Sequence, residues 1–304
     1  MDGATAADVP DVRCAGAPDA GRRGALHHFS SRLITALGDP RHRGLDLVAS
    51  ADTETQRLEG WISYTVFDKA LEDEDVDVFA CRAGAWQRVG GARTDDEGHF
   101  TLALAGDNRL PVGLRDMFIS VVGDRTGVGF LADVAPTGTR LVVSDVDGTL
   151  TSSENAFLET VVLGGEPGAR DGAAAAYTAA GGRGEQIVYL TARGNQYTTA
   201  TRSWLAARSF PRGPLRLSPS FVTLPGGDTV DFKANVLAGL TAAGYAIGAG
   251  VGNRASDVEA YARAGVAADR TFVEVPEFLD EVQPLIDAGQ AIGFSSYAAL
   301  ASQL

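Results

Sequence analysis

Asp145-Val146-Asp147-Gly148-Thr149 is the stretch that decides the fold of this 304-residue chain. The run Leu141-Val142-Val143 just before it is apolar and β-branched, which is typical of a buried parallel strand. Two carboxylates only two residues apart at the end of such a strand repel one another and lose hydration. A divalent cation between them would remove both costs. The stretch therefore predicts a parallel α/β sheet with a metal-dependent site at the end of one strand.

The composition is that of a globular protein, with 45% hydrophobic and 21% charged residues, and the length suffices for two domains. The net charge of −13 argues against a nucleic-acid partner, which would require a basic face. No apolar run approaches transmembrane length, and the N-terminus lacks the hydrophobic region of a secretory signal. We therefore expect a protein that is soluble or attached to a membrane only at its surface, with no obligatory protein partner evident.

The two cysteines, Cys14 and Cys81, do not have the spacing of a zinc site. Two scattered cysteines do not make a disulfide framework. The expected compartment is a reducing one, the cytoplasm.

Two segments precede the first domain. Residues 1–23 are rich in Ala, Asp, Gly and Arg and are predicted to be disordered. Residues 24–39 are predicted to form an amphipathic helix, because apolar residues recur at helical spacing from Leu26 to Leu37. Such a helix either packs on its own domain or lies in a membrane interface, and the sequence leaves both alternatives open.

Residues 55–136 are predicted to form a small β-sandwich. Its expected strands, separated by turn signals, are 61–67, 76–81, 100–104 and 117–122. The acidic stretch 72–75 is expected to be a solvated turn rather than a calcium loop.

Residues 137–304 alternate between strand and helix patterns, which predicts a parallel sheet with helices on both faces and ligands at the carboxyl ends of the strands. The expected strands are 140–145, 186–191, 214–218, 246–251 and 270–275. The expected helices are 170–180, 196–208, 229–243 and 256–264.

Polar residues at these strand ends and helix starts make chemical sense together. Asp145 is expected to act as a nucleophile on phosphorus, Asp147 as an acid and base, and Thr191 and Lys233 as stabilisers of phosphoryl charge. Lys233 is placed in the first turn of a helix that begins near residue 229. A magnesium ion, which prefers hard oxygen ligands, would be held by Asp145, Asp147, Asn253 and Asp257. Neighbouring residues expected to bind the phosphate are Gly148, Thr149, Ala192 and Arg193.

Five strings in this order resemble one known family. Residues 144–151, 189–193, 214–219, 231–233 and 252–261 read SDVDGTLT, YLTAR, PLRLSP, DFK and GNRASDVEAY. Together they resemble the catalytic domain of lipins, within the haloacid dehalogenase-like superfamily, and the related domain of Nir-type phosphatidylinositol-transfer proteins shares the pattern. Thr191 departs from the Ser that lipins typically have but keeps the hydroxyl.

This resemblance implies a Mg²⁺-dependent phosphatidate phosphatase that forms an aspartyl-phosphate on Asp145 and makes diacylglycerol at a membrane surface containing phosphatidate. It also implies a haloacid dehalogenase-like (Rossmann-like) domain, a preceding immunoglobulin-like sandwich, and a membrane-binding helix near the N-terminus. Because Asp145 and Asp147 are both present, catalysis is favoured over pure lipid sensing.

The intervals between the motifs are too short for a large cap domain, so the site is expected to be open to a bulky or membrane-bound substrate. Two alternatives stay open. One is a non-catalytic module that binds phosphatidate, and the other is a phosphatase of another phosphomonoester.

Overall fold

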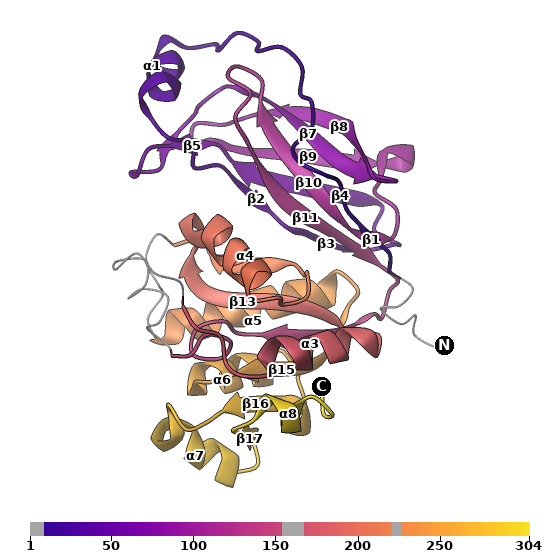
Figure 1. Cartoon of the computed structure of the whole chain (residues 1–304), viewed down its shortest axis with the longest axis vertical. Helices are drawn as coiled ribbons and strands as arrows, with labels where there is room; N and C mark the ends of the chain where they lie inside the picture. Colours follow the sequence, from indigo (N-terminus) through magenta and orange to yellow (C-terminus); the bar gives the residue numbers. More distant parts are fainter. Residues whose placement is uncertain (1–8, 154–166, 221–225) are drawn as a thin grey trace. The chain divides into compact units, whose positions relative to one another are not determined.

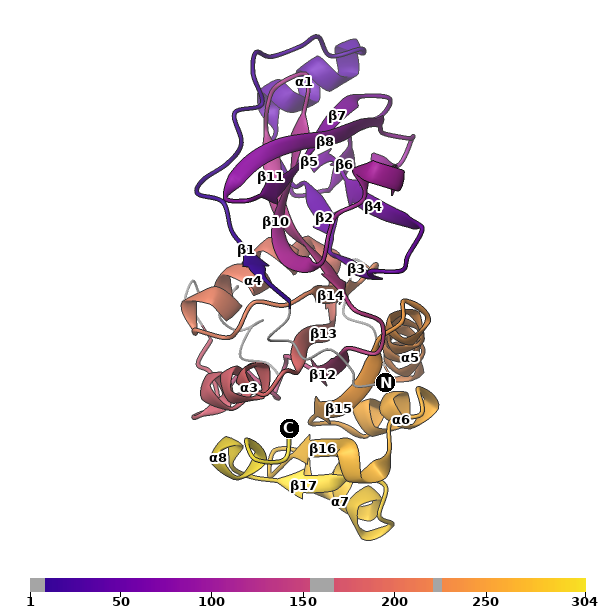
Figure 2. The same cartoon turned by 90° about the vertical axis from the view of Figure 1, so that its right-hand side faces the viewer.

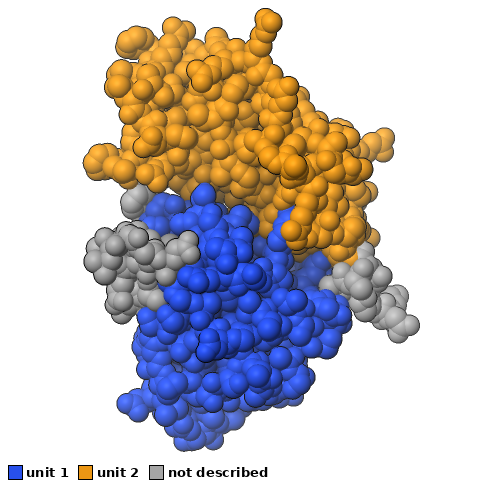
Figure 3. Space-filling model, in the orientation of Figure 1, with its two compact units in different colours: residues 1–8, 136–304 blue, residues 9–135 orange. Residues whose placement is uncertain are grey.

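The computed structural model describes residues 9–153, 167–220 and 226–304. The chain divides at residue 135 into two compact units (Figure 1; Figure 3). Unit 2 comprises Val9–Ala135, and unit 1 comprises the described residues from Pro136 onward. Within the described ranges, no helix is both long enough and apolar enough to cross a membrane.

Unit 2 is a β-sandwich of two main sheets that share one core. The larger sheet has the order β3-β11-β10-β7-β8, with β1 paired to a free part of β10. The smaller sheet has the order β2-β4-β9. The larger sheet consists of β1 (Asp11–Val12), β3 (Leu47–Ser50), β7 (Asp75–Arg82), β8 (Ala85–Arg93), β10 (Gly113–Val121) and β11 (Gly127–Ala135). The smaller consists of β2 (Arg43–Leu45), β4 (Thr55–Trp61) and β9 (His99–Ala105).

Alternation along the strands decides which side chains fill this core. In β4, Gln56, Leu58 and Gly60 are buried while the residues between them are more exposed, as a half-buried strand requires. Leu58 packs in the same apolar cluster as Val78 and Ile119 from the other sheet. The strands β2 and β3 begin upstream of residue 55, where the sandwich was predicted to start, because strands of three or four residues carry little periodic signal.

The predicted strand over 61–67 is interrupted in the structure. After β4 ends at Trp61, the chain forms β5 (Ser63–Tyr64), a turn, and β6 (Lys69–Ala70), which pairs antiparallel with β5. The turn residues Thr65 and Asp68 have φ angles of 66° and 55°, in the left-handed region that a strand cannot contain. We call residues Thr65–Asp68 the β5–β6 turn.

The prediction of disorder is wrong for residues 9–23. β1 pairs in parallel with β10, and a disulfide joins Cys14 to Cys81. The indole of Trp86 donates a hydrogen bond to the carbonyl of Gly16 at 3.1 Å. The segment is therefore held by backbone pairing and a covalent cross-link, neither of which its polar composition reveals. The expectation that the cysteines form no disulfide is wrong for the same reason, since their pairing depends on a fold that brings distant residues together.

The predicted helix near the N-terminus is α1 (Phe29–Leu37). Leu26, just before it, and Ile34 pack against the sandwich core. Phe29, Leu33 and Leu37 stay exposed. Hence α1 packs on its own domain with one face and leaves a second apolar face uncovered.

The start of α1 is anchored by the acidic stretch 72–75. The buried carboxylate of Glu74 accepts hydrogen bonds from the backbone N–H groups of His27, at 2.9 and 3.0 Å, and His28, at 3.2 Å. Asp73 and Asp75 pair with the imidazoles of His28 and His27. The stretch is therefore a helix anchor as well as a turn, because its central carboxylate satisfies donors that a helix start leaves open.

Unit 1 is a mixed α/β domain around a six-stranded parallel sheet of order β14-β13-β12-β15-β16-β17. Its strands are β12 (Arg140–Ser144), β13 (Gln186–Gly194), β14 (Leu215–Ser218), β15 (Ala246–Gly252), β16 (Thr271–Glu274) and β17 (Ile292–Phe294). The chain order reverses at β12, whose neighbours are β13 and β15. The carboxyl ends of β12 and β15 therefore form a topological switch point, where such sheets bind their ligands.

Helices cover both faces of this sheet (Figure 2). They are α3 (Ala173–Gly182), α4 (Thr198–Ala207), α5 (Gly226–Ala242), α6 (Ala255–Arg263), α7 (Leu279–Asp287) and α8 (Tyr297–Leu300). Figure 2 shows α3 and α8 on one face and α5, α6 and α7 on the other. One apolar cluster joins α3, α4 and α8 to the strands, and a smaller one lies between β16, α6 and α7. The absence of a large cap stays a prediction, because residues 154–166 and 221–225 lie outside the described ranges.

Candidate functional site

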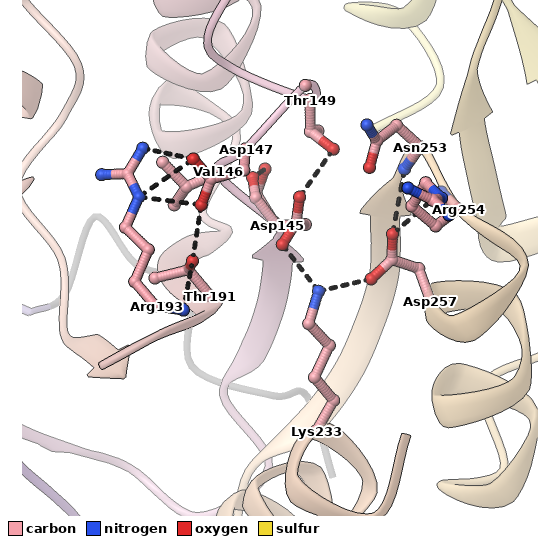
Figure 4. A network of polar contacts seen from close by, with 12 residues as sticks. Asp145, Val146, Asp147, Thr149, Thr191, Arg193, Lys233, Asn253, Arg254 and Asp257 are labelled. Atoms are coloured by element: carbon pink, nitrogen blue, oxygen red, sulfur yellow. Dashed lines mark hydrogen bonds and ion pairs between the residues drawn. The ribbon is translucent and has the colours of Figure 1, made fainter. Parts of the chain in front are cut away.

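The centre of the candidate site is a buried ion pair between Asp145 and Lys233 (Figure 4). Asp145 follows β12, and its backbone N–H bonds to the carbonyl of Val251 in β15, which fixes it at the switch point. The ammonium of Lys233 lies 2.6 Å from Oδ1 of Asp145 and 2.5 Å from Oδ1 of Asp257. Burial alone would lower the pKa of Lys233, but the two carboxylates outweigh burial and hold its pKa above the ordinary value.

Lys233 does not lie in the first turn of its helix, as was predicted. α5 begins at Gly226, so Lys233 is about two turns further along and is not close to the helix N-terminus. A Lys at that terminus would have been disfavoured by the helix dipole. That conflict disappears with the observed helix start, and the two carboxylates alone account for the position of the ammonium.

Asp257 serves both the pair and the start of α6. Its Oδ2 accepts hydrogen bonds from the backbone N–H groups of Asn253 at 3.0 Å and Arg254 at 3.1 Å. Asp257 is therefore a helix-capping residue with its second oxygen on Lys233. Both of its oxygens are engaged, and Asn253 lies buried beside it at the end of β15.

Asp147 belongs to a second cluster beside the first. The guanidinium of Arg193 donates three hydrogen bonds of 2.6 to 3.0 Å to the two oxygens of Asp147. The hydroxyl of Thr191 donates a fourth, at 2.9 Å. Thr191 and Arg193 are both in β13 and both buried, while Asp147 is partly exposed. A bidentate Arg–carboxylate pair is the strongest geometry available to these groups.

The backbone between the two aspartates and Thr149 turns sharply at Gly148, whose φ is 69°. Its N–H donates to the hydroxyl of Thr151 at 2.8 Å, and the Thr149 hydroxyl donates to Oδ2 of Asp145 at 3.0 Å. Ala192 lies in β13 between Thr191 and Arg193 and contributes backbone only. The predicted site residues are thus brought together at the carboxyl ends of β12, β13 and β15, with Lys233 reaching in from α5. Their individual roles stay predictions.

Two residues that hold the Gly148–Thr149 backbone were missed. Arg170 donates two hydrogen bonds to the carbonyl of Gly148, at 2.9 and 3.2 Å, and Tyr297 donates one to the carbonyl of Thr149 at 2.6 Å. Arg170 is itself held by Glu274 at 3.1 Å and Glu277 at 2.9 Å. No motif marks Arg170 or Tyr297, because each acts through tertiary contact with a stretch distant in the sequence.

The charges of the cluster bear on what it can bind. Three carboxylates (Asp145, Asp147 and Asp257) and two cations (Lys233 and Arg193) leave a formal charge of −1 when all are ionised. Among the described residues, no group of three or more His, Cys, Asp or Glu side chains is arranged to hold a metal ion. The available donors are hard oxygens, which fit Mg²⁺ if water and a ligand phosphate complete its coordination.

Both units match the models of known domains. Residues 142–274 match the model of the LNS2 domain of PITM 1-3, and residues 40–134 match that of the beta-sandwich domain of PITM 1-3. Protein retinal degeneration B of Drosophila melanogaster is 28% identical over 236 residues, covering 76% of this chain and 18% of that protein. Human membrane-associated phosphatidylinositol transfer protein 3 is 28% identical over 246 residues, covering 80% and 24%. The chain thus spans about a fifth of these relatives.

These matches overturn the lipin-type identification and, with it, the predicted phosphatidate phosphatase and its hydrolase activity. The models are of PITM domains, and the second relative is named as a phosphatidylinositol transfer protein, not as a hydrolase. The prediction relied on the intact Asp145/Asp147 pair. These two residues can have the same structural role in the loop whether or not a phosphate ester bond is hydrolysed.

The prediction of peripheral membrane association agrees with the name of the human relative, which is a membrane-associated phosphatidylinositol transfer protein. Among solved structures, a putative beta-phosphoglucomutase from Thermotoga maritima aligns with 54% of this chain and 97% of its own, at 14% identity and a TM-score of 0.38. A likeness of that size carries no argument.

Proposed function

We propose that this chain is a non-catalytic lipid-recognition module that binds a phosphomonoester headgroup, such as that of phosphatidate, at a membrane surface. The observation that carries the proposal is the convergence of Lys233, Arg193, Thr149 and Thr191 on one loop at the switch point of the sheet. In this structure these donors bond to Asp145 and Asp147, and hydroxyl, ammonium and guanidinium groups are of the kinds that recognise phosphate oxygens. In the relatives, the matching region belongs to proteins named for membrane association and phosphatidylinositol transfer, and we extend to this chain only the recognition of a lipid.

Mg²⁺ is part of the proposal because the cluster alone is formally anionic. A phosphate dianion would be repelled by a site of charge −1, whereas one divalent cation reverses the sign of the site. Asp145 and Asn253, which follow neighbouring strands, would hold the ion, which when bound supplies positive charge to phosphate oxygens. Lys233 would orient Asp145 through their ion pair, and Arg193 would orient Asp147 in the same way.

We also propose the finer fold assignments, a haloacid dehalogenase-like domain without a large cap and an immunoglobulin-like sandwich. The six-stranded parallel order with the aspartates after β12 supports the first, and two packed sheets with one core support the second. An uncapped site would let a headgroup bind while its acyl chains remain in the bilayer.

The test is equilibrium binding of a soluble, short-chain phosphatidate to the full chain, with Mg²⁺ or with a chelator. Binding is expected to require Mg²⁺, and no phosphate release above background is expected. Thr191→Val, which removes the hydroxyl but keeps the shape, is expected to weaken binding about tenfold, the size of a hydrogen bond to a charged group. Thr191→Ser keeps the hydroxyl and serves as the matched control.

Asp145→Asn is expected to abolish the Mg²⁺-dependent part of the binding, because it removes the charge that would attract the ion. Equal affinity for short-chain phosphatidate and phosphatidylcholine would contradict headgroup recognition. Turnover of phosphatidate that Asp145→Asn abolishes would contradict the non-catalytic assignment.

A further inference from the structure

We propose that unit 2 docks on an anionic bilayer through an apolar surface formed by α1 and the β5–β6 turn. We call this surface the apolar rim and define it as Phe29, Leu33, Leu37, Val66 and Phe67. The inference rests on the proposed function in one respect, that the chain works at a membrane, and it names the part of the molecule that contacts the lipid.

The rim gathers nearly all of the strongly exposed large apolar side chains. Six such side chains occur among the described residues, and five of them form the rim. Phe67 is 88% exposed and Val66 67%, while Phe29 and Leu37 are each 79% exposed. Scattered exposed leucines are ordinary in globular proteins, but a cluster of this kind is not. The exposed apolar side chains of the rim therefore do not contribute to the core of unit 2.

The two parts of the rim adjoin one another. Pro40, just after α1, forms a β-bridge with Tyr64, and the N–H of Thr65 donates to the carbonyl of Asp39 at 2.9 Å. Gly38, at the end of α1, lies so close to Thr65 that a Cβ there would come within 2.7 Å of the Thr65 methyl. Leu37 and Val66 are the next residues on either side of these contacts, so the turn adjoins the C-terminal end of the helix.

An ion pair and hydrogen bonds hold the base of the β5–β6 turn, although Val66 and Phe67 at its tip are exposed and do not pack in the core. Arg43 donates to both oxygens of Asp68, at 2.5 and 2.7 Å, and the Ser63 hydroxyl donates to Asp68 at 2.5 Å. Arg43 is itself buried. Burying a bidentate ion pair costs desolvation free energy, which a surface turn that only connects two strands does not need. Here it fixes the backbone that presents Val66 and Phe67, so little entropy is lost when they insert.

The chemistry of the rim favours a bilayer over a protein partner. On α1, Phe29, Leu33 and Leu37 are spaced by four residues and form one stripe, as in a helix that lies in the membrane interface. Arg32 on α1 and Arg41 after it are exposed cations next to the apolar residues, whereas Lys69 after the turn is paired with Glu72. Although the whole chain carries a charge of −13, this local arrangement matches an anionic lipid surface.

The experiment is flotation of the full chain with vesicles of phosphatidylcholine alone, or mixed with phosphatidate or with phosphatidylserine at equal surface charge. The double variant Val66→Ser, Phe67→Ser is expected to lower the partition coefficient about tenfold on both anionic vesicles, or ~1.4 kcal/mol. Leu279→Ser is the matched control and should change nothing, because Leu279 is the exposed large apolar residue outside the rim in the part of the chain that the structure describes. Unchanged thermal unfolding of both variants excludes a folding defect.

A second measurement places the turn in the lipid. The fluorescence of the indole introduced by Phe67→Trp should be quenched by lipids brominated in their acyl chains when the protein is bound to vesicles. Rim variants that partition like the wild type, or an introduced indole that escapes quenching, would overturn the proposal. So would a wild-type chain that binds none of the vesicles, and the rim would then fit a protein partner.

Failure here is distinguishable from failure of the proposed function. Soluble short-chain phosphatidate does not require the rim, so the double rim variant should bind it with wild-type affinity. Thr191→Val should lose the preference for phosphatidate over phosphatidylserine vesicles but keep the affinity that the rim provides. If the double rim variant partitions onto vesicles like the wild type, the rim proposal is wrong. If Thr191→Val keeps the preference for phosphatidate vesicles, the headgroup proposal is wrong.

Discussion

At the residue scale, Lys233 illustrates how a buried charge determines its surroundings. An isolated ammonium in this position would be neutralised by burial, yet two carboxylates at 2.5 and 2.6 Å keep it charged. The same contacts orient Asp145 and close the start of α6 through Asp257. One Lys side chain thereby links β12, α5 and α6, and the candidate site is part of the core of unit 1 rather than an addition to its surface.

Glu274 gives the site a pH dependence that can be measured. Burial raises the pKa of its carboxyl to about 7, with Arg170 opposing the shift and Glu277 adding to it. Between pH 4.5 and 7 the folded state then binds more protons than the unfolded state, so stability falls as pH rises through this window. Glu274→Gln should remove that loss.

We expect the free energy of unfolding of the wild type, relative to Glu274→Gln, to decrease by ~1–3 kcal/mol between about pH 4.5 and about pH 8. Urea unfolding of both proteins at each pH measures it, and the comparison cancels the contributions of all other titrating groups. A difference that stays constant with pH would mean that Glu274 titrates at its ordinary pKa.

Sequence reasoning located Asp145, Thr191 and Lys233 because each sits in a motif at a strand end or on a helix. It could not find Arg170 and Tyr297, which act on the backbone carbonyls of Gly148 and Thr149. Every residue has a backbone carbonyl, so the residue type at positions 148 and 149 does not show which side chain bonds to it. Sequence reasoning also favoured catalysis over recognition, which is wrong, because both uses require the same residues on the same loop.

At the scale of elements, β12 through β16 were predictable because their apolar segments alternate with helical patterns along the chain. β1 and β17 were not, since strands of two and three residues have no periodicity and depend on their partners. The sequence pattern predicts a strand through the β5–β6 turn because the apolar residues Val66 and Phe67 continue the pattern of the strand before them. Their exposure is the reverse of what an apolar run normally indicates, and it is the observation on which the apolar rim rests.

The N-terminal segment offers a prediction for an element that composition described as disordered. The disulfide between Cys14 and Cys81 closes a loop across 67 residues, so removing it should destabilise unit 2 by about 2–4 kcal/mol. The double variant Cys14→Ala, Cys81→Ala should also speed backbone hydrogen exchange in β1 and in the part of β10 that pairs with it. The wild type kept in reductant should behave in the same way.

Trp86→Phe is the control, because it removes the indole hydrogen bond to Gly16 but leaves the cross-link in place. This variant should lower the free energy of unfolding of unit 2 by only about 1 kcal/mol, the contribution of one exposed hydrogen bond. Wild-type exchange rates in β1 after loss of the disulfide would show that backbone pairing alone holds the segment.

At the scale of the whole molecule, each unit has a core of its own. The apolar cluster of the sandwich contains only residues of unit 2, and the clusters around the parallel sheet contain only residues of unit 1. Fragments 9–135 and 136–304 are therefore expected to fold separately, as domains with independent cores do. The two proposed lipid contacts are divided in the same way, with the rim on unit 2 and the headgroup site on unit 1.

This division makes the affinity of the intact chain a test of both contacts at once. Fragment 9–135 should bind anionic vesicles without preferring a headgroup, and fragment 136–304 should bind phosphatidate weakly and only with Mg²⁺. Joined in one chain, the second contact forms at the effective concentration that the connection provides, so phosphatidate vesicles should bind the intact chain at least about a hundredfold more tightly than either fragment. Vesicle flotation with phosphatidate against phosphatidylserine measures it, since the gain should vanish on phosphatidylserine. An intact chain that binds no better than fragment 9–135 would mean that the two contacts cannot reach one membrane together.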